Sequence, residues 1–112
     1  MPRPLESLRV LDLTRALSGP FCTMILGDLG ADVIKVEPTP DGEMIRAWGP
    51  FHDGIGVFYL SVNRNKRSLA IDFRNPKGLD LLKRIAIESD VLVENFKPGT
   101  ADKLGIGYET LK

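Results

Sequence analysis

The arrangement of residues 8–37 constrains the fold more than any other part of the chain. Leu8–Leu13 (LRVLDL) is a short apolar run typical of a buried strand, and Asp32–Glu37 (DVIKVE) is a second one. Between them, Pro20 begins a segment whose apolar residues keep helical spacing, namely Phe21, Met24, Ile25 and Leu29. A strand, a helix and a strand in about 30 residues predict a βαβ unit with parallel strands.

The rest of the chain repeats this alternation. Ser68–Phe73 (SLAIDF) and Asp90–Asn95 (DVLVEN) are two further predicted strands. Asn75 and Pro76 supply the cap and the first-turn proline that begin a helix, and Gly99–Leu104 predicts a short one. The order β-α-β-loop-β-α-β-α predicts an α/β fold, a Rossmann-like, open, mostly parallel sheet with flanking helices.

One long segment, Pro38–Ser61, interrupts the alternation. Proline and glycine recur throughout it, at positions 38, 40, 42, 49, 50, 54 and 56. These residues predict a long loop, and loops of this length in compact domains are often functional.

Composition excludes several classes of partner. Fifteen Lys and Arg balance fifteen Asp and Glu, so the chain has no broad basic field for nucleic acid or acidic membranes. Any recognition of an anion must therefore be local. One cysteine, Cys22, and one histidine, His52, do not form a metal cluster, and we expect Cys22 to be a small core residue. With no membrane-length apolar run and no secretion signal, we expect a cytoplasmic protein.

Polar residues gather where the predicted strands end. The first strand is followed by residues 14–20 (TRALSGP), the third by 72–76 (DFRNP) and the last by 94–99 (ENFKPG). In open parallel sheets the carboxyl ends of the strands meet at one edge, and ligands bind there. The predicted helix starts at Ser18 and Asn75 offer free N–H groups to an anion, although Asn75 is expected to act mainly as a cap.

Other functional interpretations of these residues are weaker. A dinucleotide site needs three glycines after the first strand, and this turn has one, although Glu37 ends the second strand as a ribose-binding acid would. Asp12, Asp28 and Asp72 are candidate catalytic carboxylates, with Asp28 expected on a solvated helix face. The run Arg64–Arg67 (RNKR) is expected to be a solvated turn.

Four stretches of the chain together resemble one known family. They are PLESLRVLDLTRALSGPFCTMILGDLGADVIKVE (4–37), RAWGP (46–50), NRNKRSLAIDF (63–73) and DVLVENFKPGTADKLGIGYETL (90–111). The family is the class III CoA-transferases, which includes formyl-CoA transferase and carnitine CoA-transferase, with α-methylacyl-CoA racemase as a relative. The resemblance implies that residues 1–112 are the N-terminal part of a CoA-binding, Rossmann-like large domain in a longer protein.

The resemblance also implies an activity. The longer protein would be a class III CoA-transferase that moves coenzyme A between carboxylic acids through an aspartyl mixed anhydride, without a metal. Its partners would be an acyl-CoA, a carboxylic acid and a second copy of itself in an interlocked homodimer, with no nucleic acid or membrane. Because the nucleophilic aspartate would follow residue 112, no catalytic residue is assigned here, and the segment alone is expected to be inactive. The alternatives are an acyl-CoA racemase or epimerase of the same family, and a non-catalytic fragment for CoA binding or assembly.

Ten residues are implied as contacts of CoA. They follow the first, third and last strands and the short helix: Leu17, Ser18, Ile71, Asp72, Phe73, Arg74, Asn95, Phe96, Lys97 and Lys103. One position departs from the family, because an arginine that some members carry after the second strand is Pro38 here.

Overall fold

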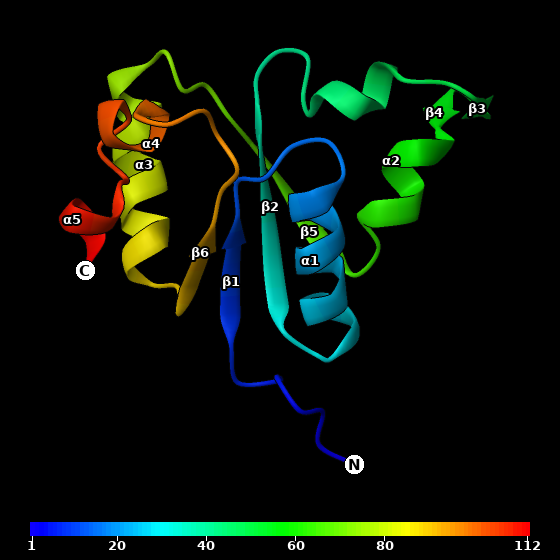
Figure 1. The fold of residues 1–112 in the computed structure, drawn as a ribbon, viewed down its shortest axis with the longest axis horizontal. Helices are drawn as coiled ribbons and strands as arrows, with labels where there is room; N and C mark the ends of the chain where they lie inside the picture. Colours follow the sequence, from blue (N-terminus) through cyan, green and yellow to red (C-terminus); the bar gives the residue numbers. More distant parts are fainter.

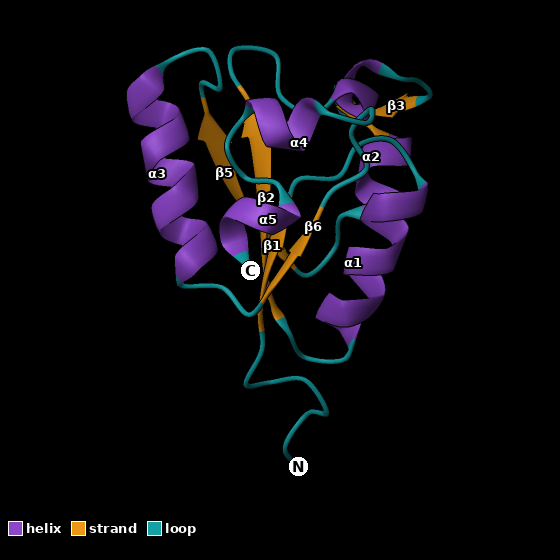
Figure 2. Ribbon diagram, turned by 60° about the vertical axis from the view of Figure 1, so that its left-hand side comes forward, coloured by secondary structure: helices purple, strands orange, loops and turns teal.

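The computed structural model describes residues 1–112 as three layers, with a sheet between helices (Figures 1 and 2). The sheet is parallel, has the order β5-β2-β1-β6, and consists of β1 (Arg9–Asp12), β2 (Asp32–Pro38), β5 (Lys66–Ile71) and β6 (Val91–Val93). Helix α1 (Ser18–Asp28) covers one face and α3 (Pro76–Ile87) covers the other (Figure 2). The predicted α/β fold with its open parallel sheet is confirmed.

The segment that we predicted as a long loop contains regular structure. Its elements are η1 (Met44–Ala47), the hairpin strands β3 (Phe51–His52) and β4 (Ile55–Gly56), and helix α2 (Val57–Val62). The prediction of a structureless loop up to Ser61 is therefore wrong. Helix α2 is too short for periodicity to reveal it. The ring of Trp48, the residue directly after η1, packs against the ring of Phe58 in α2, with 5.9 Å between the ring centres.

The third large strand begins earlier than its apolar pattern indicates. Strand β5 starts at Lys66, inside the run that we expected to be a solvated turn. The Lys66 side chain is only 2% exposed, because its ammonium binds the buried carboxylate of Asp12. Two short helices, α4 (Thr100–Lys103) and α5 (Tyr108–Leu111), end the chain. None of the helices is long and apolar enough to cross a membrane.

The two faces of the sheet differ in polarity. Toward α3 the strands place apolar side chains, and Leu11, Val36, Ile71 and Leu82 belong to one buried cluster. Each such buried side chain contributes about 1.5–3 kcal/mol to folding. Toward α1, Val10, Ala31 and Val33 form a small apolar cluster, and the face also carries a buried ionic group, Asp12, Lys35 and Lys66.

Helix α1 therefore rests on the sheet mainly through small residues, and Met24 is the one large apolar side chain that it buries. Its buried residues are Gly19, Pro20, Thr23, Met24 and Gly27. A Cβ at Gly19 would collide with the side chain of Thr14, so only glycine allows this approach. Of the four apolar residues with helical spacing, Phe21, Ile25 and Leu29 are exposed and Met24 is buried. Cys22 is also exposed, so the expectation of a core cysteine is wrong.

The helix cap at the start of α3 was predicted from the sequence and can be tested by mutation. Asn75 caps this helix as predicted, and its Oδ1 accepts a hydrogen bond from the Lys77 N–H at 2.9 Å. We expect Asn75→Ala to lower the free energy of unfolding by about 1 kcal/mol, while Asn75→Ser keeps most of it. Urea unfolding measures both values, and equal stability of the two variants would contradict the capping role.

Candidate functional site

Two neighbouring cavities open at the carboxyl edge of the sheet. The strands end at this edge, which is toward the top of Figure 1. The first, about 390 Å³, is lined by Arg15, Ala16, Met44, Asn95, Phe96, Lys97 and Thr100. The second, about 510 Å³, is lined by Arg15, Pro38, Thr39, Pro40, Asp41, Gly42, Met44, Asp72, Phe73 and Arg74. Arg15 and Met44 belong to both, so the two cavities adjoin along these side chains.

Six of the ten sequence-predicted contacts line these cavities. They are Asp72, Phe73 and Arg74 in the second cavity and Asn95, Phe96 and Lys97 in the first. The other four do not line either cavity: Leu17, Ser18 and Lys103 are exposed nearby, and Ile71 lies in the core. Ile71 could reach a ligand only through its backbone, and its carbonyl already accepts from the Thr39 N–H.

Sequence reasoning missed two residues that both cavities share. Met44 comes from the segment predicted as a loop, so no pattern identified it. Arg15 did carry a signal, because it is the cation in the turn that follows the first strand.

The turn that carries Arg15 is held by side chains from four other parts of the chain. Asp12 accepts a hydrogen bond from the Thr14 N–H, and Lys35 donates one to the Thr14 carbonyl. Asn95 binds both backbone groups of Arg15.

The next residue of the turn, Ala16, is held by Glu43. Glu43, which is buried, accepts a hydrogen bond from the Ala16 N–H at 3.0 Å. Ala16 itself has a left-handed φ of 65°, a conformation that costs an alanine about 1–2 kcal/mol and that these contacts hold.

An ionic network supports this turn from below. Asp12 lies opposite Lys35 in the sheet, is fully buried, and accepts hydrogen bonds from Thr14, Thr23 and Lys66. Burial favours a higher pKa for Asp12, but the charges of Lys35 and Lys66 and the two hydroxyl groups hold its pKa below the usual value. Because both carboxylate oxygens are engaged inside the protein, Asp12 supports the site and is not a candidate catalytic group.

Another buried carboxylate, Glu37, attaches the segment after β2 to the sheet. Its oxygens accept hydrogen bonds from Arg46 at 2.6 and 2.7 Å, from the Glu43 N–H at 2.8 Å and from the Tyr59 hydroxyl at 3.0 Å. Burial opposes ionisation, yet these donors lower the pKa of Glu37 to about 2. Burial, together with the Glu37 charge, raises the pKa of Tyr59 to about 12. Glu37 is thus used within the protein and is not free to bind a ribose.

Comparison with known proteins identifies the family. The family model described as CoA-transferase family III matches residues 5–112. The chain belongs to CoA-transferase family III. It is 52% identical over 110 residues to the succinyl-CoA:glutarate CoA-transferase of Homo sapiens, a match covering 97% of this chain and 25% of that relative. It is 48% identical over 113 residues to the succinyl-CoA:mesaconate CoA-transferase of Haloarcula hispanica, covering 96% of this chain and 28% of that relative.

A solved structure agrees with the fold of this family III chain. The crystal structure of a CAIB/BAIF family protein from Brucella suis superimposes with a TM-score of 0.91 at 45% sequence identity. The match covers 99% of this chain and 30% of that one. The chain therefore spans between a quarter and a third of the length of the relatives it matches.

The other candidate carboxylates of the family III chain are paired at its surface. Asp28 binds Arg64 at 2.6 Å, and this hydrogen bond holds the pKa of Asp28 below its usual value. Asp72 accepts hydrogen bonds from the backbone and side chain of Arg74, which lower the pKa of Asp72. His52 is exposed in the β3–β4 hairpin. No three His, Cys, Asp or Glu side chains are grouped to hold a metal ion.

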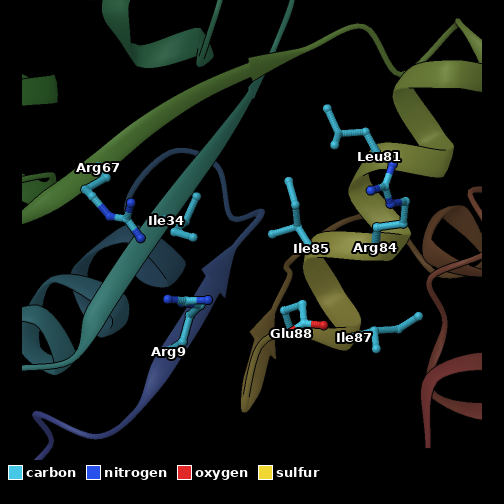
Figure 3. Close-up of a pocket in the computed structure, with 8 residues that line it drawn as sticks. All are labelled: Arg9, Ile34, Arg67, Leu81, Arg84, Ile85, Ile87 and Glu88. Atoms are coloured by element: carbon cyan, nitrogen blue, oxygen red, sulfur yellow. The ribbon is translucent and has the colours of Figure 1, made fainter.

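The largest cavity of the family III chain lies at the other end of the sheet (Figure 3). It measures about 580 Å³ and is lined by Arg9, Ile34, Arg67, Leu81, Arg84, Ile85, Ile87 and Glu88. Arg9 and Arg67 share a single carboxylate, that of Asp32, at 3.0 and 2.7 Å, and Glu88 also lines the cavity. At the carboxyl edge, where parallel sheets bind ligands, Arg15 and Lys97 line the first cavity and form no salt bridge, so this edge is the better site for an anionic ligand.

Proposed function

We propose that this chain supplies part of the CoA-binding site of an enzyme that transfers coenzyme A from an acyl-CoA to a carboxylic acid. The observation that carries the proposal is the convergence of six predicted CoA contacts on two adjoining cavities at the carboxyl edge of the sheet. Each cavity is lined by a cation of its own, Lys97 in the first and Arg74 in the second. Two separate cations suit CoA, which carries a diphosphate and a separate 3′-phosphate. Arg74 uses one nitrogen, Nε, to bind Asp72 at 3.2 Å, which leaves its terminal nitrogens for a ligand.

The names of the relatives support a more specific activity. Two of them transfer CoA from succinyl-CoA to glutarate or mesaconate, so we propose succinyl-CoA as donor and a dicarboxylic acid as acceptor. These names favour transfer over the racemase alternative. The chemistry would proceed through an aspartyl mixed anhydride on an aspartate that is not assigned in this chain. The interlocked homodimer and the cytoplasmic location are parts of the same proposal.

Calorimetric titration of the full-length protein with CoA tests the site. We expect Arg74→Ala and Lys97→Ala each to weaken binding by roughly tenfold, because a charge-assisted hydrogen bond contributes about 1.5–3 kcal/mol and exposure reduces this. Arg84→Ala, which removes a cation from the opposite edge, is the matched control and should bind CoA like the wild type. Normal binding by both Arg74→Ala and Lys97→Ala would reject the site.

A transfer assay tests the reaction separately. The full-length protein is mixed with succinyl-CoA and glutarate, and glutaryl-CoA is measured by mass spectrometry. Formation of glutaryl-CoA supports transfer between dicarboxylic acids. If CoA binds but no dicarboxylic acid accepts it, the site stands and the proposed reaction is wrong.

A further inference from the structure

We propose that Arg15 is an anion-binding residue of this site, and that Asn95 acts by holding Arg15 in place rather than by contacting the ligand. The proposal rests on the proposed function, because the anion that we assign to Arg15 is the diphosphate of CoA. It also gives Asn95, which the resemblance implies as a CoA contact, a positioning role.

The location of Arg15 determines the part of the ligand it would meet. Arg15 is the charged residue that the two cavities share, so a ligand that occupies both must pass over it. In CoA the diphosphate joins the adenosine part to the pantetheine part, so it lies in the middle of the molecule. A planar guanidinium can donate two parallel hydrogen bonds to phosphate oxygens, which suits this position.

Arg15 differs from most arginines of the chain because its guanidinium has no carboxylate partner. The arginines that form salt bridges are Arg9, Arg46, Arg64, Arg67 and Arg74. Arg15 is exposed at the carboxyl edge and belongs to none of these pairs. Its charge is therefore available to an anion without the separation of an existing ion pair.

Although it is exposed, Arg15 is held at both its backbone and its side chain. The Asn95 Oδ1 accepts a hydrogen bond from the Arg15 N–H at 2.8 Å, and the Asn95 Nδ2 donates one to the Arg15 carbonyl at 2.9 Å. The next residue, Phe96, places its ring 5.1 Å from the Arg15 guanidinium. Both polar atoms of the Asn95 amide thus hold the Arg15 backbone, and the Phe96 ring restricts the Arg15 side chain, so less entropy is lost when an anion binds.

A double-mutant cycle, read by calorimetric titration of the full-length protein with CoA, tests both roles. We expect Arg15→Ala to weaken CoA binding by roughly ten- to hundredfold and Asn95→Ala by roughly tenfold. In the Arg15→Ala background, Asn95→Ala should cause no further loss, because the residue it positions is gone. Phe96→Leu gives a second cycle that does not depend on how Asn95→Ala folds. Arg84→Ala, which removes another arginine without a carboxylate partner, is the control.

The outcomes separate this inference from the proposed function. If the wild type does not bind CoA, the proposed function fails. If the wild type binds and Arg15→Ala binds equally well, or if Asn95→Ala weakens the Arg15→Ala protein by the same factor as the wild type, the inference is wrong. Melting temperatures near that of the wild type establish that the compared variants are folded.

The choice of ligand identifies the anion that Arg15 binds. Dephospho-CoA keeps the diphosphate, so Arg15→Ala should weaken its binding by the same factor as that of CoA. If the factor disappears with dephospho-CoA, Arg15 binds the 3′-phosphate, and the assignment to the diphosphate is wrong. If only succinyl-CoA is affected, Arg15 binds the acyl carboxylate, which also overturns it.

Discussion

Asp12→Ala is expected to lower the free energy of unfolding by roughly 3–5 kcal/mol, which is a large part of the stability of a typical domain. The substitution leaves the ammonium groups of Lys35 and Lys66 buried without the carboxylate that lies between them. It also removes the acceptor for two hydroxyl groups, that of Thr14 in the turn after β1 and that of Thr23 in α1. Urea unfolding, followed by circular dichroism, measures the loss.

Asp32 provides a matched control for this prediction. It also binds two cations, Arg9 and Arg67, but all three side chains are more than a third exposed. Ion pairs in contact with water contribute about 0–1 kcal/mol, so Asp32→Ala should change stability by no more than that. Similar losses for Asp12→Ala and Asp32→Ala would mean that burial of the first network does not determine its contribution.

The contacts of Asp12 also illustrate which parts of the fold could not be predicted from the sequence. The alternation of the main strands and helices along the chain and the cap at Asn75 depend on neighbouring residues, and both were predicted correctly. The orientation of α1 was not, because Phe21 and Ile25 have the spacing of a buried face. The sheet surface beneath α1 carries a buried ionic group, and its Asp12–Lys66 contact joins residues 54 positions apart. No local pattern could reveal that surface.

The candidate site divides in the same way. Its location follows from the rule that parallel strands bind ligands at their carboxyl ends, and that rule needs only the order of the elements. Whether a single residue is buried or exposed depends on how α3 packs on the sheet, and the burial of Ile71 is an example. The Arg15 backbone is held by Asn95, which is 80 positions away in the sequence. The sequence of the turn after the first strand could therefore indicate a cation, but not the residue that holds it in place.

Stability in acid should depend strongly on Glu37, a buried carboxylate near the carboxyl edge of the sheet. The pKa of Glu37 is about 2 in the folded protein, against an ordinary value of 4.5. Because the folded-state pKa is depressed, the stabilisation is complete above about pH 5 and is lost as the pH falls toward 2. A difference of this size corresponds to at most about 3 kcal/mol, because Glu37 is only 3% exposed but its partner Arg46 is 40% exposed and partly screened by solvent.

The test compares Glu37→Gln with the wild type by urea unfolding between pH 7 and pH 3. At pH 7 the variant should be less stable by about 2–3 kcal/mol, because Arg46 and the Glu43 N–H lose a charged acceptor. The difference should then narrow as the pH falls from 5 to 3, since the wild type alone loses this contribution. Asp28→Asn, which removes an exposed ion pair, should change stability little at any pH. A constant gap between Glu37→Gln and the wild type at every pH would show that Glu37 is not ionised more readily in the folded chain.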